Sequence, residues 1–478
     1  MVLELPDNMP DKLQFLDAYG DFFLLRFLVT GDSKSLDIDN CILAHKTAVH
    51  LTPQGHEDMP SRLNELGNSF WTRFEHTGDF TDICEAISCL QKAVDLTPEG
   101  HPDMPSRLNG LRNSFQSRFE RTQDITDISE AISSLQKAVY LIPQDHEDAP
   151  IWLKNLGNSF WSRFEQTGDL TDSSEAISCL QKAVHLTSQD HDDMASRINH
   201  LGNSFRKRFQ HTGDLTDISE AIFCLQKAVH LIPQGHADMP SWLNNLGNSF
   251  RSRFQCTGDL NDIAEAISCL QKAVYLTSEG HADAADLPSW LNNLGMSYRN
   301  RFEHTGDLTD ISEAISCLQK AVQLTPQGHG NMASWLNNLG NSFLSCFQHT
   351  GDLIDISEAI SCLQKAVHFT PQDHAGMPCS LNNLGNTFCS RFDHTGDLYD
   401  LCEGISYLKK AVHLTSEENA NMPSQLNNLG NSLRSRFQHT RDLTDISDAI
   451  SCLQKAVHLT PQNHTDMASR LNNLGNSF

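Results

Sequence analysis

The chain has 478 residues, of which 39% are hydrophobic and 20% charged, and its formal net charge at pH 7 is −25. This charge disfavours DNA, RNA and anionic membranes as partners, so a basic or neutral protein or peptide is expected. No stretch approaches the roughly 18 consecutive apolar residues of a membrane span. The segment Met1–Phe15 also lacks the basic start and apolar run of a secretory signal. We therefore expect a cytoplasmic protein with no membrane contact.

The first part of the chain, 1–59, is interpreted as a diverged capping repeat. Tyr19-Gly20 stands where later copies have Leu-Gly, and the loop Gly31–Asp39 is longer than its counterparts. A terminal repeat of an array faces solvent on one side, which explains why its sequence departs from the rest.

The remaining chain repeats itself with a step of 45 residues, as from Leu201-Gly202 to Leu246-Gly247. One step is longer, because Ala282–Leu287 carries three extra residues. The pattern predicts nine repeats and the truncated start of a tenth at 468–478. The nine are 60–104, 105–149, 150–194, 195–239, 240–287, 288–332, 333–377, 378–422 and 423–467.

The first half of each repeat predicts one amphipathic helix. In 60–104, an apolar stripe recurs at helical spacing. Proline suits the first helical turn, and glycine suits the left-handed position that ends a helix. The stripe is Leu63, Leu66, Phe70 and Phe74, between Pro60 and Gly78.

A second helix follows. Asp82 and Glu85 match an Asp-x-x-Glu capping box. Ile83, Ala86, Ile87, Leu90, Ala93 and Val94 share one face, and Pro98 and Gly100 stop the helix. Neither helix can bury its stripe alone, so successive hairpins must stack into an all-α array.

This pattern resembles the tetratricopeptide family. The residues that carry the resemblance are Leu63-x-x-Leu66-Gly67-x-x-Phe70, Ala86-x-x-x-Leu90, Ala93 and Pro98. The resemblance implies a right-handed α-solenoid, with the usual unit of about 34 residues enlarged. The wording of the repeat looks like the expanded arrays of mushroom-type fungi. In that family such arrays often precede a caspase-like protease module of the CHAT type.

Asparagine recurs on the opposite face of the first helix, which the resemblance places on a concave groove. The first series is Asn64, Asn109, Asn199, Asn244, Asn292, Asn337, Asn382, Asn427 and Asn472, with Lys154 as the exception. The second series is Asn68, Asn113, Asn158, Asn203, Asn248, Asn341, Asn386, Asn431 and Asn476, with Met296 as the exception. The third series is Asn155, Asn245, Asn293, Asn338, Asn383 and Asn428.

Two interpretations of these amides stay open. A ladder of amides can pair with the backbone of an extended peptide, because each offers donors and an acceptor. Alternatively, the amides bond to one another or to neighbouring carbonyls and only set the stacking. We take the first two series as peptide-binding candidates.

The next position on this face varies from repeat to repeat: Trp71, Gln116, Trp161, Arg206, Arg251, Arg299, Leu344, Cys389 and Arg434. We call it the variable slot. Variation at one groove position is typical of a specificity determinant, and Trp71, Trp161, Arg206, Arg251, Arg299 and Arg434 are the candidates. Drift at a tolerant exposed site is the alternative.

The sequence favours neither a metal site, a cofactor nor catalysis. His-x-Asp pairs such as His56 and Asp58 recur once per repeat, too few in one place for a zinc site. Cysteines and histidines recur with the repeat, so no unique nucleophilic pair is expected. The fourteen cysteines are expected to be free and mostly buried thiols. Arg73 and its copies are expected to pair with loop acids such as Asp79.

These features predict a protein-interaction scaffold and no enzyme. The alternative is the sensing arm of a CHAT-type cysteine protease whose catalytic module lies outside this chain. The sequence stops inside a first helix, at Phe478. An uncapped apolar end is expected to self-associate or fray.

Overall fold

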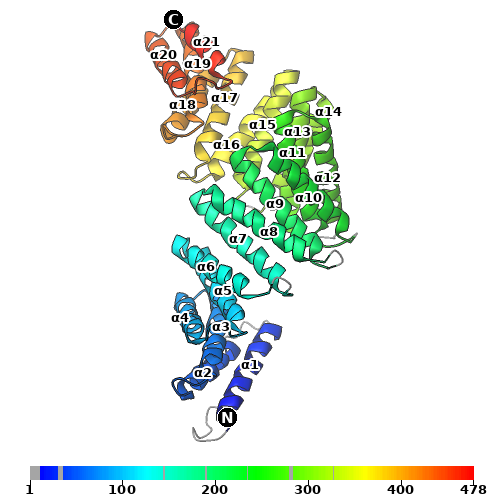
Figure 1. Cartoon of the computed structure of the whole chain (residues 1–478). Helices are drawn as coiled ribbons and strands as arrows, with labels where there is room; N and C mark the ends of the chain where they lie inside the picture. The colour runs from blue at the N-terminus through cyan, green and yellow to red at the C-terminus, as the bar shows by residue number, and fades with distance from the viewer. Residues whose placement is uncertain are drawn as a thin grey trace. The chain divides into compact units, whose positions relative to one another are not determined.

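The computed structural model describes residues 11–30, 36–143, 146–188, 191–233, 235–278, 284–326 and 328–478. These residues form helices joined by short turns, and no strand occurs among them (Figure 1). The chain divides into two compact units, Met1–Leu231 and Ile232–Phe478.

Unit 1 contains ten helices within the described ranges, paired as hairpins from α1 with α2 to α9 with α10. They are α1 (Lys12–Thr30), α2 (Leu36–Leu51), α3 (Met59–Thr77), α4 (Phe80–Leu96), α5 (Met104–Thr122), α6 (Ile125–Leu141), α7 (Ala149–Thr167), α8 (Leu170–Leu186), α9 (Met194–Thr212) and α10 (Leu215–Leu231). Within this unit, the second helix of each hairpin from α2 to α8 also packs against the first helix of the next hairpin.

Unit 2 continues the same alternation, from the hairpin α11–α12 to the hairpin α19–α20 and then α21. Its helices are α11 (Met239–Thr257), α12 (Leu260–Ser278), α13 (Leu287–Thr305), α14 (Leu308–Leu324), α15 (Met332–Thr350), α16 (Leu353–Phe369), α17 (Met377–Thr395), α18 (Leu398–Leu414), α19 (Met422–Thr440), α20 (Leu443–His458) and α21 (Met467–Gly475). A short 3-10 helix, η2 (Ala284–Asp286), precedes α13. The prediction of an all-α array of stacked helix hairpins is confirmed.

The two predicted loop insertions fall partly outside the described residues. Of the loop predicted at Gly31–Asp39, 31–35 are not described, and α2 already begins at Leu36, so the loop is shorter than expected. Of the insertion Ala282–Leu287, the described part forms η2 and the start of α13. Charged Asp37 and Asp39 sit in the first turn of α2, where they favour the helix N-terminus.

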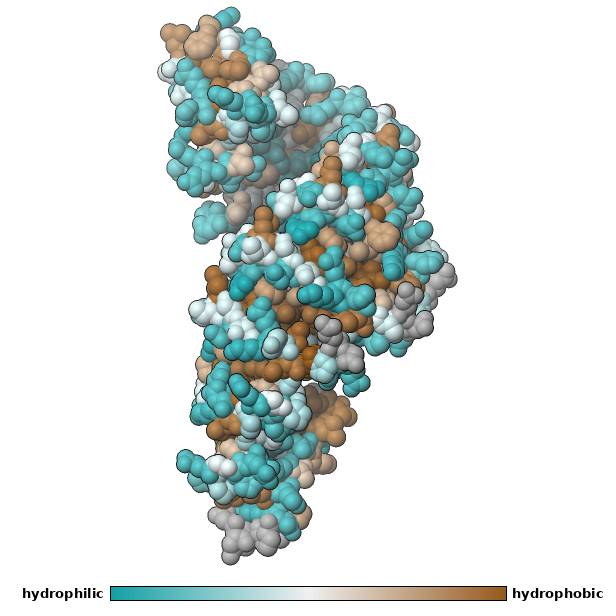
Figure 2. Space-filling model, viewed as in Figure 1, coloured by the Kyte–Doolittle hydropathy of each residue, from teal (hydrophilic) through white to brown (hydrophobic). Residues whose placement is uncertain are grey.

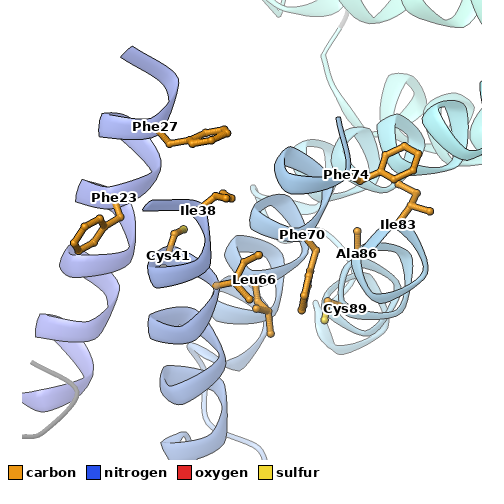
Figure 3. Packing of buried hydrophobic residues seen from close by; sticks show 11 residues of the cluster. Phe23, Phe27, Ile38, Cys41, Leu66, Phe70, Phe74, Ile83, Ala86 and Cys89 are labelled. Carbon is orange, nitrogen blue, oxygen red and sulfur yellow. The ribbon is translucent and has the colours of Figure 1, made fainter. Parts of the chain in front are cut away.

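The predicted apolar stripes form the core between helices. Figure 3 shows Phe74 of α3 beside Ile83 of α4 and Phe70 facing Ala86, whereas Leu66 lies on the side of α3 that faces α2. The cluster also takes in Phe23 and Phe27 of α1 and Ile38 and Cys41 of α2. Phe70 and Phe74 are only 2% and 1% exposed. Burial of one such side chain contributes roughly 1.5–3 kcal/mol to the free energy of unfolding. Packing between neighbouring hairpins is therefore a main source of their stability.

The outer surface is mixed in character, and Figure 2 shows apolar residues interspersed with hydrophilic ones over the visible face. Several large apolar side chains on the second helices are exposed, among them Tyr140, Phe223 and Tyr275. Scattered exposed apolar residues are normal for soluble proteins. No described helix is long and apolar enough to cross a membrane.

The turn inside each hairpin agrees with the prediction at the end of the first helix but differs from it at the start of the second. Gly78 takes the left-handed conformation with φ 74°, as expected, and its N–H donates to Phe74 O at 2.7 Å. The second helix, however, begins three residues earlier than the predicted capping box. Asp79 is its N-cap and accepts from Thr81 N at 2.9 Å. The Asp82–Glu85 box is therefore wrong, because Asp82 already lies inside the first turn.

The arginines at the edge of the stripe pair with this first-turn aspartate and not with the loop. Arg73 donates through Nε to Asp82 Oδ2 at 2.8 Å and through Nη2 to Oδ1 at 2.6 Å. The expectation of Asp79 as partner is wrong, since its carboxylate caps the helix. The same two-bond pair recurs as Arg118–Asp127, Arg163–Asp172, Arg208–Asp217, Arg253–Asp262, Arg301–Asp310, Arg391–Asp400 and Arg436–Asp445.

One repeat lacks this pair and so provides a natural test. Cys346 stands where the other repeats have arginine, opposite Asp355. We expect Arg253→Cys to destabilise unit 2 by about 2 kcal/mol, because Asp262 would lose two charge-assisted hydrogen bonds while buried. Cys346→Arg should stabilise it by about 1 kcal/mol, a smaller gain because the arginine is partly exposed.

Urea unfolding of both variants measures these changes. Lys365→Ala, an exposed change on α16, is the control that should leave the midpoint unchanged. Equal midpoints for wild type, Arg253→Cys and Cys346→Arg would refute a stabilising role for the pair.

Candidate functional site

The Asn face of the first helices is half-buried in most repeats. Asn64, Asn68, Asn341 and Asn386 are each partly covered, whereas the apolar stripe on the other side of the same helices is buried. Four members of the first and second series depart from this: Asn158, Asn472 and Asn476 are exposed, and Asn199 is buried. The predicted face is therefore accessible along its length, but it is not a fully solvated surface.

In unit 2, from Asn293 onward, the third series bonds to the first series of the preceding repeat. Asn293 Nδ2 donates to Asn244 Oδ1 at 2.9 Å, and Asn338 Nδ2 donates to Asn292 Oδ1 at 2.9 Å. The same bond links Asn383 to Asn337, Asn428 to Asn382 and Asn473 to Asn427, at 3.0 to 3.2 Å. These hydrogen bonds join successive first helices. They correspond to the second interpretation of the asparagines, in which the amides bond to one another and set the stacking.

The described part of unit 1 does not contain this chain of bonds. Third-series positions there hold Glu65, Gly110, Asn155 and His200. Asn109 Oδ1 and Asn203 Oδ1 are buried with no hydrogen-bond partner. A buried acceptor without a donor costs about 1–3 kcal/mol, so these oxygens favour a ligand or water that donates to them.

A pocket of about 590 Å³ opens on this face in unit 2, between α15, α17 and α19. Three consecutive residues of the variable slot, Leu344, Cys389 and Arg434, line it. Second-series Asn386 and Asn431 line it as well, and Asn431 Oδ1 is buried without a partner. Gln348, Ser390, Asp393, Ser435 and Gln438 complete a mostly polar wall.

A smaller pocket of about 220 Å³ lies on the same face in unit 1, between α7 and α9. Asn158, Asn203 and Trp161 line it, together with an ion pair that joins Lys207 Nζ to Glu165 Oε1 at 2.5 Å. Both pockets thus combine second-series asparagines with the variable slot.

The tryptophans of the variable slot are committed to packing. Trp161 is 5% exposed, and its Nε1 donates to Ser204 Oγ at 2.7 Å, in the next first helix. Trp71 is half-buried, and its Nε1 donates to Ser117 Oγ at 2.9 Å, at a different position of the next first helix. Their indoles join neighbouring repeats, so little of them is presented to a ligand.

The arginines of the slot are held in different ways. Arg206 Nε is buried without a partner, and burial lowers the pKa of its guanidinium. Arg299 Nε donates to Glu303 Oε1 at 3.0 Å, but its Nη1 is buried and unpaired. Arg251 Nη2 donates to Asn248 Oδ1 at 3.1 Å, which aligns the slot with the second series. Within the described ranges, Arg434 has no ion-pair partner and faces the larger pocket.

The structure also brings together a cluster that the sequence analysis missed. Cys41 Sγ and Ser69 Oγ lie 3.7 and 2.9 Å from His45 Nδ1, and neither Cys41 nor His45 has a copy in the later repeats. The expectation that no unique Cys–His pair exists is therefore wrong. His45 is 1% exposed, and burial raises the pKa of the Cys41 thiol to about 11. A buried, protonated thiol is no nucleophile, so the cluster packs α2 against α3.

The recurring His-x-Asp pairs form local turns. In the first of them, Asp58 N donates to His56 Nδ1 at 3.2 Å. Across the described ranges no group of three or more metal-ligating side chains converges. The fourteen cysteines are free, and the repeated ones are mostly buried; burial raises the pKa of Cys179 to about 11.

Glu65, at the third-series position of α3, also carries an acceptor without a hydrogen-bond partner. Its Oε2 is buried without a partner. Burial, with the nearby charges of Asp21 and Asp17, raises the pKa of Glu65 to about 7. The folded state therefore holds a proton that the unfolded chain loses near the ordinary value of 4.5.

The amide bonds between repeats predict a difference between two series of asparagines. Asn338→Ala with Asn383→Ala removes two inter-helix donors, which should cost about 1 kcal/mol each in the free energy of unfolding. Asn341→Ala with Asn386→Ala removes side chains that make no hydrogen bond to the described residues. It should leave stability unchanged or raise it, because alanine favours helix. Urea midpoints compare the two; equal losses would contradict the stacking role.

The shifted carboxyl predicts a pH-dependent N-terminal end. Because the folded pKa of Glu65 is raised, its stabilising proton is present below about pH 4.5 and is lost as pH rises through about 7. The protection factors of the α2 and α3 amides, which are exchange rates corrected for the intrinsic pH dependence, should therefore fall across that window in wild type. Glu65→Gln should flatten this dependence, whereas exposed Glu57→Gln should not. An unchanged profile in Glu65→Gln would rule out this titration.

Comparisons with known proteins add only distant likenesses. No protein-family model matches the chain, and no curated protein matches it. A solved structure of a putative kinesin light chain from Podosopora anserina, with nearly identical TPR-like repeats, is similar at 16% identity. The match covers 47% of this chain and 98% of that one, with a TM-score of 0.36.

Two further solved structures are similar over different lengths. The human IFIT1 dimer with PPP-AAAA shares 14% identity over 94% of this chain and 93% of that one, with a TM-score of 0.45. YrrB, described as a TPR protein with an unusual peptide-binding site, shares 19% identity over 50% and 93%, with a TM-score of 0.31. These scores are low, so the fold class rests on the helix hairpins described above.

Proposed function

We propose that this chain is a protein-interaction scaffold that holds a peptide segment of a partner on the Asn face of its first helices. The observation that carries the proposal is the pocket between α15, α17 and α19. It gathers the variable slot of three consecutive repeats beside Asn386 and Asn431. Scaffolds of stacked repeats use such extended faces for binding.

The pocket offers both donors and an acceptor for a peptide backbone. Arg434 and the side-chain amide of Asn386 supply donors for carbonyl or carboxylate oxygens, and the oxygen of the same amide can accept an N–H. An extended peptide presents these groups alternately along its backbone. The second series and the variable slot therefore suit a peptide better than the first series does, because first-series oxygens in unit 2 already accept bonds from the next repeat.

The chemistry of the partner follows from the charge. A net charge of −25 favours a basic or neutral protein over nucleic acid or membrane, and a cytoplasmic location agrees with this. The slot arginines act only locally, on the oxygens of the bound segment. The groove needs no cofactor or catalytic group for this function.

A second candidate function is the sensing arm of a CHAT-type cysteine protease. Its support is the resemblance of the repeat wording to expanded fungal arrays. It uses the same groove, with the added requirement that a catalytic module of the full gene product responds to the bound segment.

Selection from a displayed random-peptide library tests the scaffold function. We expect enriched peptides whose affinity falls at least about tenfold, or 1.4 kcal/mol, in the triple variant Asn386→Ala, Asn431→Ala, Arg434→Ala. The matched control, Gln364→Ala with Lys365→Ala, changes exposed side chains of α16 and should bind normally. Enriched peptides that bind both variants equally, with both folded, would exclude this face as the binding site.

A further inference from the structure

One residue near the start of each first helix fills the seam between successive hairpins. We call it the seam residue; it is Arg62, Arg107, Trp152, Arg197, Trp242, Trp290, Trp335, Ser380, Gln425 and Arg470 in chain order. All but one of these side chains are large. Arg107, Trp335 and Gln425 are at most 5% exposed, so the seam closes over them.

The arginine and glutamine seam residues bond to the same places in the preceding hairpin. Arg107 Nη2 donates to Ser61 Oγ at 2.9 Å and Nη1 donates to Thr97 Oγ1. Arg470 repeats both bonds with Ser424 and Thr460. Gln425 Oε1 accepts from Thr415 Oγ1 at 2.7 Å. A hydroxyl on the preceding first helix and one after the preceding second helix thus mark the seat of the side chain.

At Ser380 the seat is present but the large side chain is missing. A pocket of about 410 Å³ lies there, between α15, the end of α16 and the start of α17. Its walls include Ser334 and Thr370, the counterparts of the two hydroxyls that Arg107 uses. Ser380 is 7% exposed. Its side chain is much shorter than the arginine or tryptophan of other repeats, so it does not fill the space.

Most other repeats place either arginine or tryptophan at this position. The residues around the pocket at Ser380 suit tryptophan and not arginine. Every seam arginine has an aspartate four residues earlier: Asp58, Asp103, Asp193 and Asp466, within 3.4 Å of the guanidinium. Gly376 stands at that position before Ser380. A guanidinium in this pocket would lack its carboxylate, which is costly for a charge taken out of water.

The pocket does offer surfaces on which an aromatic ring can pack. His329 accepts the N–H of Asn331 and stacks on Trp335, with ring centroids 5.5 Å apart and planes 19° apart. His374, one repeat later, is held by the same turn, since Gly376 N donates to its Nδ1 at 3.0 Å. Within the described ranges no ring stacks on His374, which lines the pocket. Met332 and Phe369 add apolar surface.

We propose that the pocket at Ser380 binds a planar aromatic ring, supplied as a tryptophan side chain by a partner polypeptide. The indole takes the seat that Trp335 fills in the preceding repeat, beside His374 and over Met332. First-series Asn337 lines the same pocket, so a peptide on the Asn face can reach it. That the ring comes from such a peptide rests on the proposed function; the binding of a ring to the pocket does not.

The volume is ample for one ring. A cavity of about 150 Å³ is enough to bind benzene in a protein interior. This pocket is larger and open on one side, so a lone ring should bind with a dissociation constant of roughly 1 mM. A ring attached to a peptide should bind more tightly, because the second contact becomes intramolecular.

Cys379 provides a direct readout. It is exposed, lines the pocket and has three other exposed thiols of the chain as internal references: Cys84, Cys256 and Cys402. Alkylation by iodoacetamide, followed by mass spectrometry, is measured with and without N-acetyltryptophanamide. We expect the ring to slow alkylation of Cys379 at least about threefold at saturation and to leave the three references unchanged.

Two variants fill the seat with residues that other repeats use. Ser380→Trp and Ser380→Gln should both abolish the protection of Cys379, while circular dichroism and thermal melting verify folding. Protection that persists in both folded variants, or its absence in wild type at the solubility limit of the probe, would overturn the proposal.

The groove variant separates this inference from the proposed function. Asn386→Ala, Asn431→Ala, Arg434→Ala should retain protection of Cys379 by the free probe. If groove-binding peptides are selected, those containing tryptophan should lose at least about fivefold in affinity to Ser380→Trp. Peptides that bind wild type and Ser380→Trp equally would show that the ring does not come from the groove ligand.

Discussion

In every hairpin except α5–α6, where Arg112 takes this position, the two helices approach each other closely at one glycine. A Cβ on Gly340 would lie 2.7 Å from Leu363 Cγ, closer than real Cβ atoms approach, and 3.1 Å from Ala359 O, which is tighter than most contacts. Glycine permits this contact without a shift of the Leu363 side chain or of the second helix. The contact fixes how each first helix is rotated, so Leu339 and Phe343 point into the core. The Asn face then necessarily points away from the second helix.

The helical period explains why this much could be predicted. Apolar spacing identifies the buried stripe, and Gly78 marks the end of the first helix, because both are local signals. The start of the second helix was predicted wrongly, since Asp79 and Asp82 are both acceptable caps three residues apart. The wrong partner for Arg73 followed from the same error: once Asp79 is the cap, Asp82 is the free carboxylate one turn on.

What lies between repeats could not be predicted from one repeat. The sequence left the asparagines with two interpretations, and only the geometry shows that Asn338 donates to Asn292. The empty seat at Ser380 likewise depends on residues from two hairpins. A signal for it existed nevertheless: aligned copies show a serine where every other repeat has arginine, tryptophan or glutamine. Cys41 and His45 were overlooked because they belong to the diverged first hairpin.

The asparagine bonds have a consequence for how such a chain changes over generations. Each bond joins the same two residue types, for example Asn383 to Asn337 and Asn428 to Asn382. A block of 45 residues could be copied or deleted between them, as an unequal crossover would do, and the new junction would bear the same donor and acceptor. The scaffold can therefore lengthen or shorten by whole repeats without a compensating mutation. A pocket such as that at Ser380 can be duplicated or lost together with the repeats that form it.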